Sequence, residues 1–492
     1  MHAIHPDRSW PLHGVARTRQ LEQLAQAQLR PQVLMQRAGL AVAQLALALA
    51  PHARTIWLAC GPGNNGGDGM LAALHLKRWG KHAVVTWLGT PESAPADAAA
   101  AYQAAVQAGV EFAATPPEQP DLCVDALFGI GLSRGAAPRA PNPTLTYWLE
   151  HLQRNSAPVL AVDVPSGLDA DTGCATTQTV RAHHTLSLLT LKPGLFTANG
   201  RDASGQVWFD DLGLHGDATA SAHAHANADA RLIAPPAPWP RPHASHKGSY
   251  GDVAVIGGAA GMTGAAVLAA RAALHHGAGR VFVGLLDEST TALDPVQPEL
   301  MFRAVPTLAL ADMAVVCGCG GGDAVRAPLP RVLSTAKAVI IDADAINSIA
   351  NDTQLQSLLA ARGARGVATV LTPHPLEAAR LLGTSAAEVQ QDRLAAAQAL
   401  AERFACVVVL KGSGTIVAGP GHIPAINPTG NASLATAGTG DVLAGMVGAA
   451  LAAGLAPFAA ATQCVYTHGL AADHWPATRA LVASALFAPP LP

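Results

Sequence analysis

The chain has 492 residues, enough for two or more domains that each bury a hydrophobic core. Its 31 Lys and Arg residues nearly balance 34 Asp and Glu residues, so the formal net charge of −3 provides no positive field to hold nucleic acid. Hydrophobic residues make up 50% of the chain and charged residues 13%, a composition that excludes extensive disorder. We therefore expect compact folded domains without a nucleic-acid partner.

The first ten residues, MHAIHPDRSW, contain His, Asp and Arg where a secretory signal needs an unbroken apolar core, so we expect a cytoplasmic protein. Residues 442–461 carry no charge and have about the length of a membrane span. Their Ala and Gly content and Pro457 favour a buried core helix instead, so we expect no membrane partner. The seven cysteines form no paired C-x-x-C clusters, which favours reduced thiols.

In the first half, short apolar runs alternate with helical segments rich in Ala and Leu, a pattern typical of a parallel sheet with crossover helices. We predict helices at 33–50, 68–79 and 97–108, and strands at 55–60, 83–88, 122–126 and 159–164. Each predicted strand ends in a glycine-rich or acidic loop. Ligands of such sheets bind beyond the carboxyl ends of the strands, so we expect the chemistry in these loops.

Residues 215–242 are first small and polar and then rich in proline, which indicates a domain boundary. We predict domains at 1–216 and 231–492, joined by a linker at 217–230. Beyond the linker, strands are predicted at 252–256, 339–341 and 406–410, each followed by glycines or acidic residues. No sequence repeat relates the halves, so we predict two different α/β domains.

The loop after the first predicted strand reads GPGNNGGDG, at residues 61–69. Free backbone N–H groups beside a helix N-terminus are typical of an anion site. Asn64 and Asn65 add amide groups, and Asp68 is able to cap the helix or hold a cation. A plain glycine turn is the alternative, although five glycines cost backbone entropy that a connector does not need.

Two further loops place a carboxylate at the end of a predicted strand. VDALFGIGLSRG spans 124–135 and contains Asp125, while AVDVPSGLDADTG spans 161–173 and contains Asp163. Arg134 is able to bind a phosphate with two hydrogen bonds. A single Asp of this kind is more often a cap or turn residue, but three such loops in one domain favour a site.

These three loops, with LMQRAG at 34–39 and LKPGL at 191–195, resemble the NAD(P)H-hydrate epimerase family over residues 10–215. The resemblance implies a Rossmann-like, three-layer αβα domain that binds K⁺ and interconverts the R and S hydrates of NADH or NADPH. It implies that Asp163 is the catalytic acid or base, and that Asn65, Asp125 and Ser166 hold K⁺. The implied substrate-binding residues are Asn64, Gly129, Ile130, Gly131, Leu132, Ser133, Arg134, Gly135 and Asp163. Gln36, Ile130 and the pair Ala182–His183 depart from the family pattern.

The second half contains the loop AGTGD at 437–441 before a predicted helix. Gly438–Gly440 supply N–H groups for a transferring phosphoryl group, and Asp441 lies where it could accept a hydroxyl proton. An ordinary helix N-cap is the alternative. The glycine-rich turn at 257–264 could bind phosphate but is weak evidence by itself.

SHKGSYG, GMTGAAVLAARAAL, QPELM, LTPHP and NPTGNASLATAGTGDVLAG together resemble the ribokinase-like superfamily. Within it, residues 231–480 resemble the ADP/ATP-dependent NAD(P)H-hydrate dehydratases, although CGCGGG at 317–322 replaces the expected GPGLG. The resemblance implies that Asp441 is the catalytic base. The implied nucleotide-binding residues are Lys411, Gly412, Ser413, Gly414, Thr415 and Gly440, and the implied hydrate contacts are Ala265, Gly320, His374 and Asp441.

The implied dehydration proceeds by phosphorylation of the ring hydroxyl by ADP and elimination of phosphate, with Mg²⁺ neutralising the diphosphate. Our leading hypothesis is a bifunctional repair enzyme that acts on hydrated NADH and NADPH (NADHX and NADPHX), releases AMP and phosphate, and assembles as a homo-oligomer like related proteins. One alternative is a ribokinase-like kinase for a vitamin precursor. Another is that the first half is a non-catalytic binding domain.

Overall fold

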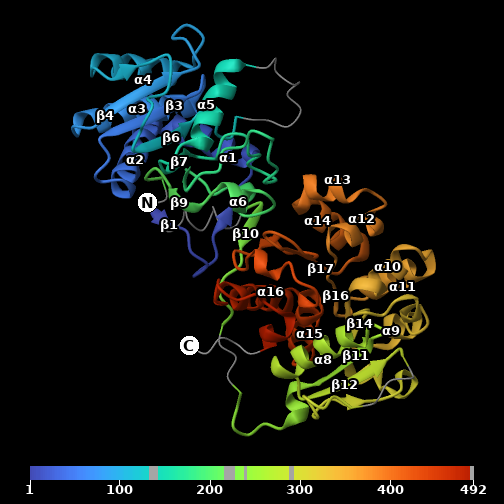
Figure 1. Cartoon of the computed structure of the whole chain (residues 1–492). Coiled ribbons are helices and arrows are strands. Elements are labelled where there is room, and N and C mark those ends of the chain that lie inside the picture. Colours follow the sequence, from blue (N-terminus) through green and yellow to red (C-terminus); the bar gives the residue numbers. More distant parts are fainter. Residues whose placement is uncertain (132–141, 215–227, 238–240, 288–292, 488–492) are drawn as a thin grey trace. The chain divides into compact units, whose positions relative to one another are not determined.

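The protein is described by a computed structural model that covers residues 1–131, 142–214, 228–237, 241–287 and 293–487 (Figure 1). Contacts divide the chain into two compact units, Met1–His5 with Trp10–Ala230 and Pro6–Ser9 with Arg231–Pro492. Residues 6–9 thus belong to the second unit, although the predicted first domain included them. Most of the predicted linker at 217–230 lies outside the described residues, so its boundaries stay a prediction.

The described part of the first unit contains an eight-stranded sheet with the order β1-β9-β8-β7-β6-β3-β4-β5. Neighbouring strands are parallel except for β1 and β9. The strand order reverses between β3 and β6, which is where ligands bind in such sheets. The strands are β1 His2–Ala3, β3 Thr55–Cys60, β4 His82–Trp87, β5 Glu111–Phe112, β6 Leu122–Ala126, β7 Val159–Val162, β8 His184–Leu188 and β9 Gln206–Asp210, and the short β2 is Pro11–Leu12.

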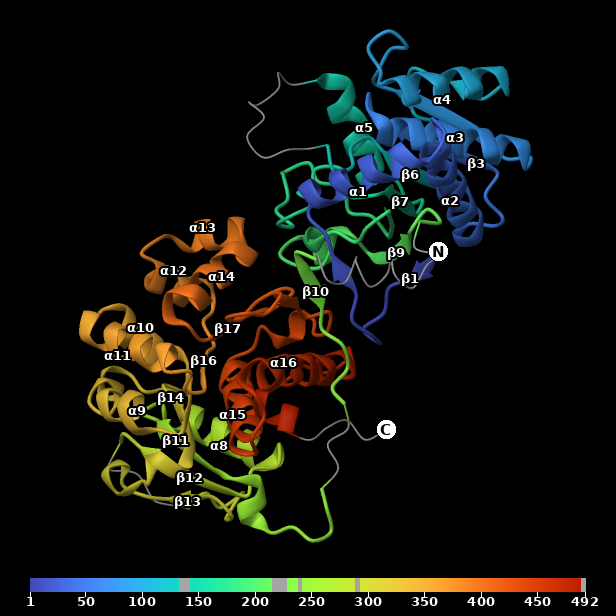
Figure 2. The same cartoon turned by 180° about the vertical axis from the view of Figure 1, so that it is seen from behind.

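Helices cover both faces of this sheet (Figures 1 and 2). Ile56 and Leu58 pack with α2, α3 and α4 in one core cluster, whereas Trp57 and Ala59 pack with α5 in another. Successive strand residues point to opposite faces, so this alternation confirms the predicted three-layer αβα arrangement. The helices are α1 Val15–Gln28, α2 Val33–Leu49, α3 Asn64–Arg78, α4 Ala96–Gln107, α5 Pro143–Arg154 and α6 Gly200–Ala203.

The predicted elements of the first unit are confirmed to within two residues, except at the start of α3. This helix begins at Asn64 rather than at residue 68, so Asn64 and Asn65 lie in its first turn and not in a loop. Close packing explains the difference, because a Cβ atom at Gly66 would lie 2.0 Å from the Gly61 carbonyl oxygen. Glycine therefore lets the helix begin directly beside the end of β3.

The second unit has its own sheet, in which the order runs β13-β12-β11-β14-β15-β16-β17-β18-β19-β10. From β13 to β17, each strand is parallel to the next in the sheet, whereas β18 is antiparallel to both β17 and β19. The strands are β10 Ala230–Leu232, β11 Asp252–Gly257, β12 Arg280–Leu285, β13 Met301–Phe302, β14 Met313–Cys317, β15 Ala338–Ile341, β16 Thr369–Leu371, β17 Val407–Leu410, β18 Ile416–Ala418 and β19 Ala425–Ile426. The three strands predicted for this half are confirmed as β11, β15 and β17 to within one residue.

Helices α8, α15 and α16 pack on one face of this sheet in a single core cluster with β11 and β15 (Figure 2). The helices are α8 Thr263–His275, α9 Leu329–Thr335, α10 Ala343–Ala350, α11 Thr353–Ala364, α12 Pro375–Leu382, α13 Ala386–Gln391, α14 Arg393–Phe404, α15 Thr439–Ala452 and α16 Pro457–Asp473. A Cβ atom at Gly445 would lie 2.0 Å from the Ala269 carbonyl oxygen, so small residues let α15 and α8 pack closely.

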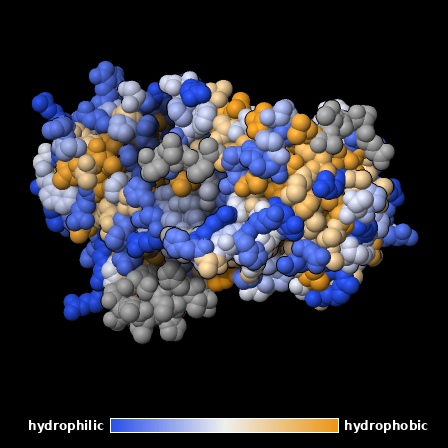
Figure 3. All heavy atoms as spheres, turned by 90° about the horizontal axis from the view of Figure 1, so that it is seen from below, coloured by the Kyte–Doolittle hydropathy of each residue, from blue (hydrophilic) through white to orange (hydrophobic). Residues whose placement is uncertain are grey.

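Most of the charge-free segment 442–461 is buried as predicted, but Gly454 and Ala456 are exposed and the prediction of one core helix was wrong. The chain breaks between α15 and α16, where Gly454 has a φ of +96° and Pro457 occupies the first position of the next helix. Among the described helices, none by itself is long and apolar enough to cross a membrane, and α1 and α2 meet that criterion only as a pair bent by 115°. Figure 3 shows hydrophobic and hydrophilic side chains interspersed on one face.

Candidate active sites

The first unit contains a cavity of about 410 Å³ beside the loops that follow β3, β6 and β7. The strand order reverses between β3 and β6, so the loops that leave these two strands diverge and create a crevice. Its lining includes charged groups and three of the predicted loops. Residues that line it include Glu22, Asn64, Asn65, Asp68, Asp97, Gly129, Ile130, Gly131, Asp163 and Lys192.

Asp163 follows β7 with a φ of +68°, a left-handed conformation that is uncommon for any residue with a side chain. Its buried carboxylate forms an ion pair with Lys192, whose Nζ donates to Asp163 Oδ1. The backbone N–H of Leu188 donates to the same oxygen at 3.2 Å. The strained backbone and two donors therefore fix the direction of this carboxylate.

The structure brings Asp163, Asn65 and Gly129 together from three separate loops. A Cβ atom at Gly129 would lie 3.0 Å from Asn65 Oδ1 and 3.1 Å from Asp163 Oδ2. Asn64 is exposed at the start of α3 and lines the same cavity. Ile130 and Gly131 also line it. The predicted substrate contacts Leu132, Ser133, Arg134 and Gly135 lie outside the described residues.

Asp125 and Ser166 form a buried pair beneath the loop that follows β6. Asp125 accepts hydrogen bonds from Ser166 N at 2.8 Å and from Ser166 Oγ at 2.6 Å. Ser166 Oγ in turn accepts from Phe128 N at 2.9 Å. Burial raises the pKa of Asp125 to about 6, against the lowering effect of the Ser166 hydrogen bonds.

The implied K⁺ ligands are chemically suited to a hard cation, because they supply amide, carboxylate and hydroxyl oxygens. Asp125 is fully buried, and no Lys or Arg of the described residues forms an ion pair with it. The buried Nδ2 of Asn65 also has no hydrogen-bond partner in the described part of the chain. A flip of the Asn65 side-chain amide would exchange the two atoms and place Oδ1 where the unpaired Nδ2 now lies. The residues therefore fit a bound cation, and the K⁺ assignment stays a prediction.

Lys192, Glu22 and Asp97 also line the cavity, although no role was predicted for them from the sequence. Burial and the nearby Asp163 raise the pKa of Glu22, and the same two causes raise that of Asp68 well above its usual range. Lys192 lies in the LKPGL segment, which was the only available signal. Glu22 and Asp97 lie in helices away from the glycine-rich loops, so no motif indicated them.

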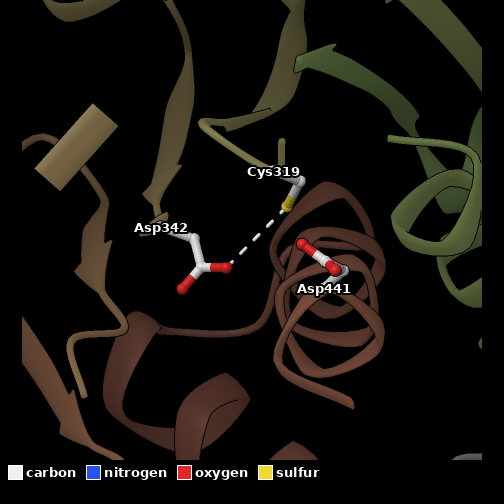
Figure 4. Close-up of side chains that lie close together, drawn as sticks. All are labelled: Cys319, Asp342 and Asp441. Carbon is white, nitrogen blue, oxygen red and sulfur yellow. Dashed lines mark hydrogen bonds between the residues drawn. The ribbon is translucent and has the colours of Figure 1, made fainter. Parts of the chain in front are cut away.

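In the second unit, Cys319, Asp342 and Asp441 come together from three elements (Figure 4). Cys319 follows β14, Asp342 follows β15, and Asp441 lies in the first turn of α15. One ligand atom of each residue lies within 4.8 Å of the others, and Cys319 Sγ is 3.8 Å from Asp342 Oδ2. The three side chains therefore face one another at the carboxyl edge of the sheet.

Lys411 connects this cluster to the predicted nucleotide-binding residues. Its Nζ donates to Asp342 Oδ1 at 2.7 Å, and Thr372 Oγ1 donates to the same oxygen at 2.7 Å. A Cβ atom at Gly440 would lie 3.3 Å from Lys411 Nζ, so Lys411 and Gly440 are adjacent. The predicted site residues did not include Asp342, although its position after a strand was the available signal.

The Asp441 carboxyl has an environment suited to proton transfer. Burial and the negative charge of Asp342 raise its pKa to about 6, whereas Cys319 and Lys411 act in the opposite direction. At pH 7 most molecules therefore carry an ionised Asp441 that is able to accept a proton. Its pKa also lies close to neutral pH, which is where an efficient general base has its pKa.

Loop 411–415 turns sharply at Gly412, which has a φ of +131°. A Cβ atom there would lie 2.9 Å from Arg393 Nη1. The buried Arg393 donates to the Lys411 carbonyl oxygen at 3.2 Å, and Thr415 Oγ1 donates to the Gly412 carbonyl oxygen at 3.0 Å. Arg393 thus stabilises the conformation of this loop. The contacts of Gly412, Ser413, Gly414 and Thr415 with a nucleotide stay a prediction.

The predicted hydrate contacts Ala265 and Gly320 are neighbours, since a Cβ atom at Gly320 would lie 2.9 Å from Ala265 Cβ. His374 caps α12, and its Nδ1 accepts from Leu376 N at 3.1 Å. Its Nε2 lies 3.2 Å from Glu377 Oε1, and burial together with the positive charge of Lys411 lowers its pKa. His374 is therefore held as a neutral ring, and its contact with a hydrate stays a prediction.

The donor set of the cluster also limits how Mg²⁺ could bind there. Asp342 and Asp441 offer the hard carboxylate oxygens that Mg²⁺ takes, whereas the Cys319 thiol is a soft ligand. Mg²⁺ usually binds through one or two carboxylates together with substrate phosphates. The residues present therefore fit a Mg²⁺ ion that would take most of its ligands from a bound diphosphate and one or two from the carboxylates.

Comparison with known proteins gives matches in both units. Residues 31–194 match the model of the YjeF-related protein N-terminus, and residues 253–488 match that of NAD(P)H-hydrate dehydratase. The ADP-dependent (S)-NAD(P)H-hydrate dehydratase of Neisseria meningitidis is 45% identical over 240 residues, which cover 47% of this chain and 80% of that protein. A solved ADP/ATP-dependent NAD(P)H-hydrate dehydratase from Bacillus subtilis is 32% identical with a TM-score of 0.43, covering 50% of this chain and 90% of that one.

The bifunctional NAD(P)H-hydrate repair enzyme Nnr of Escherichia coli matches both units at once. It is 38% identical over 469 residues, which cover 92% of this chain and 88% of that protein. The predicted repair enzyme, with an epimerase half followed by a dehydratase half, is confirmed by these matches. The chain belongs to the family of bifunctional NAD(P)H-hydrate repair enzymes.

Proposed function

We propose that the two reactions of this family take place at the two carboxylate centres, with Asp163 serving the epimerase and Asp441 the dehydratase. The observation that carries the proposal is that each unit holds such a carboxylate beside a lysine at the carboxyl edge of its own sheet. Asp163 has one oxygen fixed by Lys192, and Asp441 has a pKa of about 6 beside Lys411. Each centre thus has a group that is able to move a proton where a dinucleotide can bind.

Epimerisation inverts the ring carbon that bears the hydroxyl group. One bond at this carbon must break and re-form on the opposite face, with a proton moving at the hydroxyl or the ring nitrogen. Asp163 Oδ2 is the atom available to accept and return that proton, because Oδ1 already accepts from Lys192 and Leu188. K⁺, when bound by Asn65, Asp125 and Ser166, supplies the positive charge that compensates the buried Asp125 carboxylate.

Dehydration of the S hydrate begins when Asp441 accepts the hydroxyl proton. The freed oxygen bonds to the terminal phosphorus of ADP as the bond from that phosphorus to AMP breaks. The ring carbon–oxygen bond then breaks, phosphate leaves with the electron pair, and loss of a proton from the neighbouring carbon restores the reduced nicotinamide. Lys411 and the backbone N–H of Gly440 are placed to balance the phosphoryl charge. Mg²⁺, when bound, neutralises the diphosphate.

ADP as the donor is supported by the name of the Neisseria relative. The alternative of a vitamin-precursor kinase beside a non-catalytic domain predicts a stable phosphorylated product. The match to a bifunctional repair enzyme over 92% of the chain favours repair instead. The homo-oligomer and the cytoplasmic location stay predictions.

The test is to follow recovery of reduced-nicotinamide absorbance from a mixture of R and S NADH hydrates, using the full chain and Mg²⁺ with ADP, with ATP or with neither. We expect complete recovery with ADP, with AMP and phosphate as products. Recovery that stops at the S fraction would show that the first unit does not epimerise. A phosphorylated product without recovery would favour the kinase.

A further inference from the structure

Lys192 is a fully buried lysine that lines the cavity of the first unit. Burial of an ammonium group costs several kcal/mol unless its protons are paired. Besides Asp163 Oδ1, Lys192 Nζ donates to the Leu188 carbonyl oxygen at 2.8 Å and to Ser187 Oγ at 3.4 Å. An apolar side chain of similar size would fill the same space without this cost, so the packing of the site does not account for a lysine here.

The two oxygens of Asp163 have different environments. Oδ1 accepts from Lys192 Nζ and Leu188 N. Oδ2 accepts no hydrogen bond from the described residues, and it lies 3.1 Å from the place where a Cβ atom of residue 129 would be. The ion pair therefore occupies one oxygen and leaves the other turned toward the glycine loop and the cavity.

The charged groups around Asp163 are mostly negative. Glu22 comes from α1, Asp68 from α3 and Asp97 from α4, and all three line the cavity. Arg19 also lines it but is exposed, whereas Lys192 is buried against Asp163. Buried carboxylates near one another disfavour ionisation, and a buried cation in contact with one of them favours it. Lys192 is therefore the buried cation that offsets the negative charge around Asp163.

We propose that Lys192 is a positioning residue of the epimerase, which holds the Asp163 carboxylate at Oδ1 and turns Oδ2 toward the reacting ring. The inference rests on the proposed role of Asp163 and deepens it by naming the residue that sets the direction of that base. Lys192 acts through Asp163, and the free oxygen of Asp163 moves the proton.

The test uses the full chain with Lys192→Met, Lys192→Arg and the control Lys81→Met, and measures conversion of pure R hydrate to S hydrate without nucleotide. Lys81 belongs to the same unit, outside the cavity lining, where it donates to the carbonyl oxygens of Pro51 and Ala53 at 2.7 Å. We expect Lys192→Met to lower kcat about 10²-fold with little change in KM, because the base is misdirected while the substrate still binds. Lys192→Arg restores most of the kcat, and Lys81→Met has the wild-type kcat and KM.

The second activity of the chain is a built-in control for the amount of intact chain, because each variant is expected to dehydrate S hydrate at the wild-type initial rate. A double variant tests whether Lys192 acts only through Asp163. Asp163→Asn with Lys192→Met should then be no slower than Asp163→Asn alone. Losses that multiply would overturn the proposal.

Two other outcomes separate this inference from the proposed function. If Asp163→Asn abolishes epimerisation but Lys192→Met keeps the wild-type kcat, or loses activity only through a higher KM, the positioning role is wrong and the base assignment stands. If Asp163→Asn itself epimerises normally, both are wrong.

Discussion

Replacing Asp441 by Asn should abolish dehydration and at the same time make the second unit more stable. The pKa of Asp441 is about 6 in the folded protein instead of 3.8, mainly because of burial. At about 1.4 kcal/mol for each pH unit, the ionised carboxylate costs the folded state about 3 kcal/mol at neutral pH. A neutral Asn of the same shape removes this cost, so the melting temperature should rise by about 6 to 12 °C.

The pH dependence of this gain has a defined sign. The cost is absent below about pH 3.8, where the carboxyl is protonated in both the folded and unfolded states, and it grows until pH reaches about 6. The stabilities of the wild type and of Asp441→Asn should therefore converge as the pH falls from about 6 to about 4. Above about pH 6 the difference should be constant.

The assay combines thermal unfolding of the full chain with the initial rate of absorbance recovery from S hydrate. ADP identifies the transition of the second unit, because a ligand that binds the folded state raises its melting temperature. Near-wild-type turnover would remove Asp441 from the mechanism. A lower melting temperature at neutral pH would refute the argument from burial, since the ionised carboxylate would then be a net stabiliser of the fold.

Three further outcomes are expected. The kcat/KM of dehydration should fall about tenfold for each pH unit below about 6, as initial rates with S hydrate would show, and a profile flat to pH 5 would point to another base. Gly129→Ala should slow epimerisation but not dehydration, because its Cβ would lie 3.0 Å from Asn65 Oδ1 and 3.1 Å from Asp163 Oδ2, and equal rates for the variant and wild type would contradict this crowding. Asp125→Ala should remove activation of the epimerase by K⁺ over a bulky organic cation, and retained activation would place the cation elsewhere.

The sequence determined the strands and the loops that carry the chemistry, because alternating apolar runs and turn residues act over a few neighbouring positions. β3 and β6 have the predicted bounds, and Asp125 and Asp163 lie at the predicted strand ends. Since parallel strands expose their carboxyl ends at one edge, this local pattern was sufficient to group Asn65, Gly129 and Asp163. The resemblance supplied the chemistry that these loops serve.

Only the tertiary structure decided which charges pair. Lys192 reaches Asp163 across 29 positions, and Lys411 reaches Asp342 across 69. Such contacts depend on which strands are neighbours, and no pattern in one segment encodes the order of the sheet. The early start of α3 depended likewise on the close approach of Gly66 to Gly61 at the end of β3. Local sequence thus placed the carboxylates, and the fold determined their partners, direction and pKa values.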